Sequence, residues 1–186
     1  MKCEGGECDS ASLLQSLALK DRSKIHEWAT DDVIEKMLFL TKSKHAGIMK
    51  IAADAQAYLY ATENPIVIDK ALEFNALQIN CELLQHKFLT NESRKTILWG
   101  LSNIAAGTER QAKAILDDSK LIGCLFWIAE NQTTDALYSI FFALTTVDIP
   151  AIKTFYDLYS DPLIFAISQL VEKASTKSND LVVESM

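Results

Sequence analysis

Apolar residues recur along most of this chain with the three-to-four-residue spacing of amphipathic helices. In the clearest case Ile97, Leu98, Leu101, Ile104 and Ala105 share one face at about 100° per residue. Sparse glycine and proline favour long helices over a turn-rich β protein. The pattern predicts an all-α chain, with a helix opened by Pro65 and further helices over 10–29, 33–42, 45–60, 76–86, 92–106, 109–117, 120–130, 133–145, 150–157 and 162–174.

Polar residues punctuate these helices. Asp31 or Asp32 is the expected N-cap of the helix over 33–42, and Pro65 suits a first helical turn. Gly107 is the expected C-cap of the helix over 92–106, and Thr108 the N-cap of the next one.

Trp99 and Asn103 lie four residues apart, on the face opposite the apolar stripe of their helix. An indole face can stack on an aliphatic or cationic stem, and an amide can bond a peptide backbone. This pair therefore suits an extended peptide. Burial of Trp99 in a second core, as in the middle layer of a layered helical protein, remains an equal alternative.

The stretch Trp99-Gly-Leu-Ser-Asn103-Ile-Ala-Ala-Gly107-Thr108 resembles the third helix of an armadillo repeat in importin-α, the nuclear-import adaptor family. Residues 109–117 resemble the first helix of the following repeat, and the similarity is specific over 92–123. In that family a Trp-x-x-x-Asn pair lines a concave groove that binds nuclear localisation signals. The resemblance implies that Trp99 stacks on a Lys or Arg stem and that Asn103 holds the peptide backbone, with Thr96 and Gly107 beside them.

Internal overlays support a repeat. Residues 115–121 match 71–77 at an offset of 44, and 98–101 match 137–140 at an offset of 39, near the 40–47 residues of armadillo or HEAT units. We expect a right-handed armadillo-repeat solenoid of about three repeats plus a partial fourth over 10–175. Flexible tails are expected over 1–9 and 176–186. The third helices would be 45–60, 92–106 and 133–145.

The overlays extend the predicted groove to neighbouring units. The 39-residue offset places Tyr138 at the Trp99 position and Phe142 at the Asn103 position, with Asp135 one turn earlier, where the family often has an acidic residue. The 44-residue offset places Ala55 and Leu59 at the same two positions, and neither suits peptide binding. The predicted peptide-binding residues are Trp99, Asn103, Gly107, Asp135, Tyr138 and Thr96.

Charge and composition narrow the function. The formal net charge of −7 over 186 residues argues against nucleic-acid phosphate binding and is compatible with a basic peptide, although mild acidity is also common for solubility. Cys81 and Cys124 lie in apolar runs and are expected in the core. The short basic clusters at 42–45 and 94–95 are expected to be solvent-facing or helix-end charge.

No phosphate-binding loop, dinucleotide fingerprint or nucleophile elbow occurs, and no metal-ligand spacing, so we expect no enzyme, no cofactor and no metal. No signal peptide and no apolar run of 18 residues occurs, so we expect no membrane partner. Residues 1–24 lack a basic cluster of the kind that binds importin-β in the family, which argues against that partner.

These observations predict an importin-α-like module that recognises basic nuclear localisation signals on cargo proteins, working in cytoplasm and nucleus. The alternative is an armadillo or HEAT scaffold that binds a folded protein and has no transport role of its own.

Overall fold

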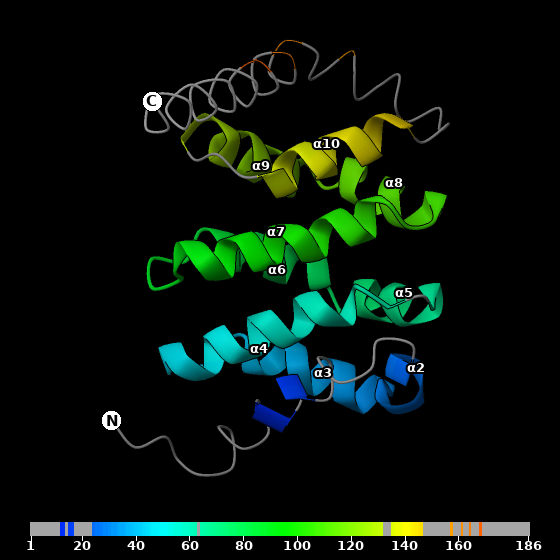
Figure 1. The fold of residues 1–186 in the computed structure, drawn as a ribbon, viewed down its shortest axis with the longest axis vertical. Helices are drawn as coiled ribbons and strands as arrows, with labels where there is room; N and C mark the ends of the chain where they lie inside the picture. The colour runs from blue at the N-terminus through cyan, green and yellow to red at the C-terminus, as the bar shows by residue number, and fades with distance from the viewer. Residues whose placement is uncertain are drawn as a thin grey trace, which may run out of the picture.

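Helices stacked in three layers make up the part of the chain that the computed structural model describes (Figure 1). That part comprises residues 24–62, 64–131 and 135–146, with isolated helical positions at 12, 13, 15, 16, 157, 161, 164 and 168; of 130, 131, 135, 136, 138, 145 and 146 only the backbone is described. The predicted tails and the predicted helices over 150–157 and 162–174 lie largely outside these residues.

Within the described residues the helices group into three successive units of three. The first unit holds α2 (Ile25–Trp28), α3 (Asp31–Leu40) and α4 (Ala46–Leu59). The second holds α5 (Pro65–Glu73), α6 (Ala76–Leu84) and α7 (Asn91–Ala105). The third holds α8 (Glu109–Asp117), α9 (Ser119–Asn131) and α10 (Asp135–Thr146).

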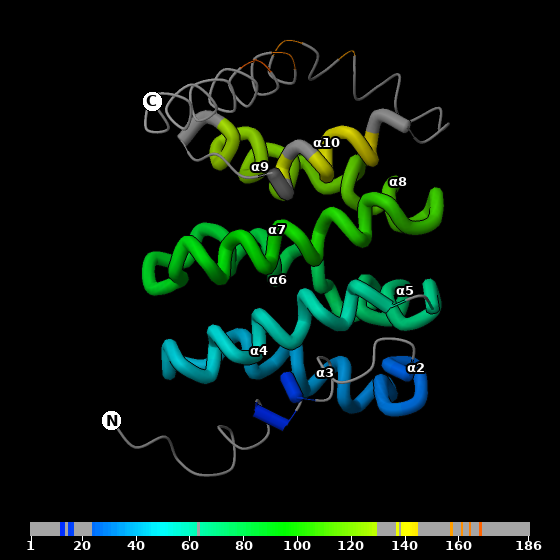
Figure 2. Tube along the Cα trace, in the orientation of Figure 1, coloured from blue at the N-terminus to red at the C-terminus, as the bar shows by residue number. Residues whose placement is uncertain are grey.

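Equivalent helices of neighbouring units lie side by side. The long third helices α4, α7 and α10 pack against one another and form the face toward the viewer in Figures 1 and 2. Behind them α6 packs on α9, and at one edge α5 packs on α8. Each unit therefore covers the apolar face of its neighbour, as expected of a solenoid.

The predicted core stripe of α7 is confirmed. Ile97, Leu98, Leu101, Ile104 and Ala105 are all buried. The predicted stripe of α10 is confirmed at Leu137, Ile140 and Leu144. Cys81 and Cys124 are both buried, as their apolar surroundings predicted.

Several helix ends behave as expected, since the Asn64 side chain accepts from the Ile66 amide ahead of Pro65 and Thr108 caps α8. Two end predictions are wrong. Asp31 and Asp32 are not N-caps but first-turn residues of α3, after Thr30, where their charge favours the helix dipole. Gly107 does not end α7 in a left-handed conformation, because Ala106 is the C-cap and no described glycine has a positive φ.

The sequence overlays placed the groove helices in the wrong register. Helix α10 starts 44 residues after α7. The buried residues Ile97, Leu98 and Leu101 match Ile140, Phe141 and Leu144 at an offset of 43. Phe142, and not Tyr138, is therefore the counterpart of Trp99, one helical turn further along. The 39-residue offset differs from the 43-residue offset by four residues, which is close to one helical turn, so it gave a similar apolar stripe.

The same comparison corrects α4. Buried residues of α4 match those of α7 at an offset of 45. At this offset Asp54 occupies the position equivalent to Trp99, and Tyr58 the position equivalent to Asn103. Ala55 and Leu59, expected at these positions, are fully buried in the core.

Candidate peptide-binding groove

Trp99 lies on α7 at the face formed by the third helices, and it is half-buried. Its ring packs edge-to-face on Tyr58 of α4, with ring centroids 5.3 Å apart and planes inclined at 64°. The two alternatives for Trp99, an exposed binding surface and burial in a second core, each hold in part. One part of the indole packs between two units and another part reaches solvent. The Tyr58 contact was missed in the sequence because the overlay was shifted by one residue.

Asn103 follows one turn later on the same face and is also half-buried. Its Nδ2 atom is buried and has no hydrogen-bond partner among the described residues. An unpaired buried donor costs free energy, about 1–3 kcal/mol. An amide nitrogen of this kind is able to donate to the carbonyl of a peptide.

A pocket of about 400 Å³ opens beside Asn103, where the ends of α4 and α7 meet the starts of α5 and α8. Its lining includes Tyr60, Thr62, Asn103, Gly107 and Thr108. Two of the predicted site residues therefore share one pocket, and residues of all three units line it.

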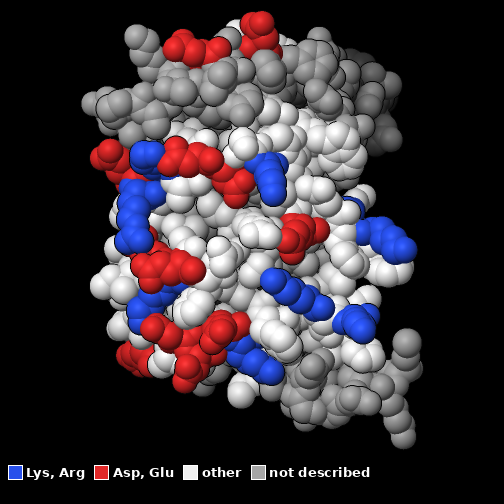
Figure 3. All heavy atoms as spheres, turned by 180° about the vertical axis from the view of Figure 1, so that it is seen from behind, with Lys and Arg blue, Asp and Glu red and all other residues white. Residues whose placement is uncertain are grey.

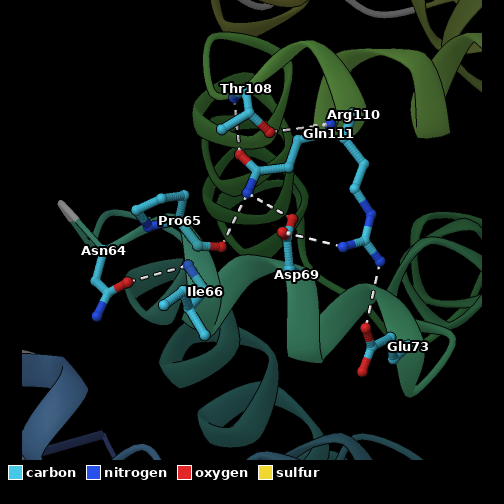
Figure 4. A network of polar contacts seen from close by, with 8 residues as sticks. All are labelled: Asn64, Pro65, Ile66, Asp69, Glu73, Thr108, Arg110 and Gln111. Carbon is cyan, nitrogen blue, oxygen red and sulfur yellow. Dashed lines mark hydrogen bonds and ion pairs between the residues drawn. The ribbon is translucent and has the colours of Figure 1, made fainter.

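The rim of this pocket is held by Gln111, which is fully buried. Its Oε1 accepts from the Thr108 amide at 3.0 Å, completing a capping box, and its Nε2 donates to the Pro65 carbonyl at 2.9 Å and to Asp69 Oδ1 at 2.8 Å (Figure 4). This side chain ties α8 of the third unit to α5 of the second.

Gly107 is exposed and lies against that network. A Cβ placed on it would lie 2.1 Å from Gln111 Oε1, so any other residue would push Gln111 out of the capping box. The glycine is required here for this close approach and not for a left-handed turn.

Thr96 is half-buried on α7, one turn before Trp99 along the same side. Its hydroxyl donates to the Glu92 carbonyl at 3.2 Å, within its own helix. Ser102 likewise donates to the Trp99 carbonyl at 2.7 Å.

Asp135 and Tyr138 lie on α10, which packs against α7. Their side chains fall outside the described part, so peptide binding by either residue stays a prediction. Phe142, which replaces Tyr138 as the counterpart of Trp99, is 58% exposed. An aromatic ring therefore stands at the Trp99 position in the third unit as well.

A buried polar network that the sequence gave no sign of lies under the first-unit side of the groove. Gln56 Nε2 donates to Asn80 Oδ1 at 2.6 Å, and Asn80 Nδ2 lies 3.4 Å from the Tyr60 hydroxyl. Burial raises the pKa of Tyr60 well above its usual value, against the opposing effect of the bonds to Asn80 and Gln56. The network joins α4 to α6 and fixes Tyr60 in the pocket wall.

Gly100 allows the third helices to approach closely. A Cβ at this position would lie 2.9 Å from the Ala57 Cα and 3.2 Å from a ring carbon of Tyr60. The glycine therefore sets the spacing of α4 and α7 across which Tyr58 and Trp99 meet.

Comparison with known proteins adds the fold class. No protein-family model matches the sequence, and no curated protein matches it. Among solved structures, computationally designed armadillo repeat proteins for modular peptide recognition superpose with a TM-score of 0.69 at 16% identity, over 87% of this chain and 72% of theirs. An engineered protein superposes at 0.68 and 18% identity, over 89% of this chain and 46% of its own. Another designed armadillo repeat protein gives 0.54 and 19%, over 92% and 76%. The chain is thus an armadillo-repeat solenoid, as predicted.

Within the described residues no helix is both long and apolar enough to cross a membrane, and no three His, Cys, Asp or Glu side chains gather as metal ligands would.

Proposed function

We propose that this solenoid binds an extended peptide segment along the face formed by α4, α7 and α10. The observation that carries the proposal is the pairing, on one face of α7, of a half-buried Trp99 with Asn103, whose buried amide nitrogen has no partner among the described residues. A helix that presents an aromatic ring beside an unpaired amide is suited to an extended peptide, because the ring can contact a peptide side chain and the amide can donate to a peptide carbonyl.

The segment is proposed to be basic. Trp99 and Tyr58 offer ring surface to a Lys or Arg stem, and the protein carries a net charge of −7. An exposed cation–π contact contributes only about 0.5–1 kcal/mol, so one aromatic-amide pair predicts weak binding. The resemblance over 92–123 extends the proposal to nuclear localisation signals on cargo, and hence to nuclear import and to the cytoplasm and nucleus.

The test is a fluorescence-polarisation titration with a labelled Lys/Arg-rich localisation peptide at two salt concentrations. We expect saturable binding that weakens with salt and is lost in Trp99→Ala/Asn103→Ala. A scrambled peptide of the same composition tests whether the order of residues in the signal matters. If it binds with the same affinity as the localisation peptide, the protein recognises basic peptides in general, and the proposed role in nuclear import is contradicted.

The variant should stay folded. Asn103→Ala removes a buried unpaired donor and should cost almost nothing. Trp99→Ala should cost less than the 3–5 kcal/mol of a fully buried Trp, about 1–3 kcal/mol, because the indole is half-buried. Unchanged peptide affinity in the folded double variant would contradict the groove.

A scaffold for a folded protein is the second candidate, and the packing of Trp99 against Tyr58 across two units favours it. On that account Trp99→Ala lowers stability by the full 3–5 kcal/mol, and no basic peptide binds to wild-type protein.

A further inference from the structure

A second surface, at the edge away from the Asn103 pocket, carries a concentration of positive charge. Residues 36–50 contain four lysines and no Asp or Glu, in a chain whose net charge is −7. These residues run from α3 through the corner that leads into α4. The corner between α6 and α7, at the left in Figure 1, adds Lys87 beside Phe88.

We name this surface the cationic edge and define it by Lys36, Phe39, Lys42, Lys44, Lys87 and Phe88. All six side chains are exposed, with Phe39 at 59% and Phe88 at 64%. Among the described residues the four lysines of this edge form no ion pair, whereas Lys50, the remaining lysine of 36–50, pairs with Asp54. In Figure 3, which views the molecule from behind, this edge lies at the right and shows more blue than red.

The opposite edge differs in this respect. There the basic side chains are engaged by carboxylates of neighbouring helices: Lys70 pairs with Asp31, and Arg110 lies 3.3 Å from Asp69 and 3.2 Å from Glu73. Charge on that edge joins units to one another, whereas charge on the cationic edge is available to a partner.

Cations and aromatic rings are interleaved on the cationic edge. Lys36 Nζ lies 5.1 Å from the Phe39 ring centroid, and Lys87 Nζ lies 4.9 Å from that of Phe88. His86 packs on Phe88 at 5.6 Å between ring centroids. Two large apolar rings thus stand in solvent on this edge, each next to an ammonium group.

A pocket of about 270 Å³ connects the two corners. Thr41, Lys42 and Ser43 line it from the first unit, and Leu83 and His86 from the second. Its apolar walls come from Met49, Ile79 and Leu83. The volume is just below that of pockets for drug-sized ligands, so it suits one apolar side chain.

The second corner is held rigidly. Arg94 Nε donates to the Leu84 carbonyl at 3.0 Å, and a terminal nitrogen donates to the His86 carbonyl at 3.1 Å. These bonds satisfy carbonyls at the end of α6 and fix Lys87 and Phe88 next to the pocket. A fixed surface binds at a lower ordering cost than a mobile one.

We propose that the cationic edge docks an acidic peptide segment that places one apolar side chain in the pocket and its carboxylates on Lys42, Lys44 and Lys87. Charge complementarity selects the partner, since the lysines form no ion pair within the described part and Lys42 lines a pocket to which Met49, Ile79 and Leu83 give an apolar wall. A phosphate backbone fits less well, because the exposed phenyl rings and the apolar walls of the pocket have no role in phosphate contacts. Glu82 also lines the pocket, so the peptide's apolar side chain, and not a carboxylate, belongs there.

The test uses a short labelled peptide in which Glu alternates with Leu, titrated by fluorescence polarisation at low and high salt. Lys42→Glu/Lys87→Glu should weaken binding roughly tenfold or more, and Phe88→Ala several-fold. Lys113→Glu/Lys120→Glu changes the net charge equally at exposed positions elsewhere and should leave affinity within about twofold. A Gln-for-Glu peptide should bind at least about tenfold more weakly.

Three outcomes would overturn the proposal. If Lys42→Glu/Lys87→Glu and Lys113→Glu/Lys120→Glu lose the same affinity for the acidic peptide, the effect comes from net charge and not from the cationic edge. Loss in Trp99→Ala/Asn103→Ala would place the acidic peptide in the groove. Tighter binding of a DNA duplex or of phosphatidylserine vesicles, with the same dependence on Lys42 and Lys87, would make the edge a phosphate surface. Because the groove variant is scored separately, failure here leaves the proposed function untouched.

Discussion

At the scale of single residues, the spacing of the third helices depends on Gly100. Gly100→Ala adds a methyl group where the Ala57 backbone is 2.9 Å away, and we expect it to lower stability by about 1–2 kcal/mol despite the better helix propensity of Ala. Chemical denaturation of both proteins measures the difference.

Gly123 provides the matched control. It lies within α9, and a Cβ there meets nothing within 4 Å. Gly123→Ala should therefore raise stability by about 0.5–1 kcal/mol. If both substitutions stabilise alike, α4 and α7 are free to move apart and the close approach is unimportant.

The two core thiols give a pH prediction at the same scale. Burial raises the pKa of Cys124 to about 11 and also raises that of Cys81. The folded thiols thus stay protonated where unfolded ones, with pKa values near 8.5, ionise. Their contribution to stability is complete below about pH 8.5 and declines as pH rises toward 11.

In a Cys3→Ser/Cys8→Ser background, a disulfide reagent at pH 8 should react with the native protein much more slowly than with the denatured protein. Urea midpoints measured from pH 7 to 10 should fall above pH 8.5, and less steeply in Cys81→Ala/Cys124→Ala. Rapid labelling of native protein would contradict the buried placement of both sulfurs.

At the scale of helices, Gln111 links α8 to α5. Gln111→Ala leaves the Thr108 amide and the Pro65 carbonyl without this partner, and we expect a loss of about 2–3 kcal/mol. The neighbouring Arg110 makes ion pairs while 63% exposed, so Arg110→Ala should cost under about 1 kcal/mol. Similar losses at both positions in thermal unfolding would show that the surface pairs, and not the buried amide, join the units.

Helix positions were predictable because the apolar stripe and the capping residues are local. The end of α4 was placed at residue 60 and lies at Leu59; the start of α9 was placed at 120 and lies at Ser119. Register between units was not predictable in the same way. A shift of one turn preserves an amphipathic pattern, so Tyr138 and Phe142 fit the sequence equally well. Only the buried positions of α10 distinguish the two registers.

The site was predictable to the extent that it lies on one helix. Trp99, Asn103 and Gly107 were proposed as site residues from one stretch of sequence, and the structure places the last two in the lining of one pocket. Tyr58, Tyr60 and Gln111 come from other helices, and their roles arise from tertiary contacts that no local spacing encodes. Asp54, which the corrected register places at the Trp99 position of α4, is buried, with Oδ2 2.9 Å from Lys50 Nζ.

At the scale of the whole molecule, the solenoid presents two surfaces of different chemistry. The third-helix face offers rings and amides around Trp99, and the cationic edge offers unpaired lysines around a small apolar pocket. Residues of the first and second units contribute to both surfaces. The two surfaces share no residue, so each can be altered by substitutions that leave the other unchanged.

The most direct measurement is a crossed titration of the basic and the acidic peptide against wild-type protein, Trp99→Ala/Asn103→Ala and Lys42→Glu/Lys87→Glu. The account predicts that the basic peptide loses binding only in the groove variant. A basic peptide that binds the folded groove variant as tightly as wild type would contradict the central claim that Trp99 and Asn103 form a peptide-binding groove.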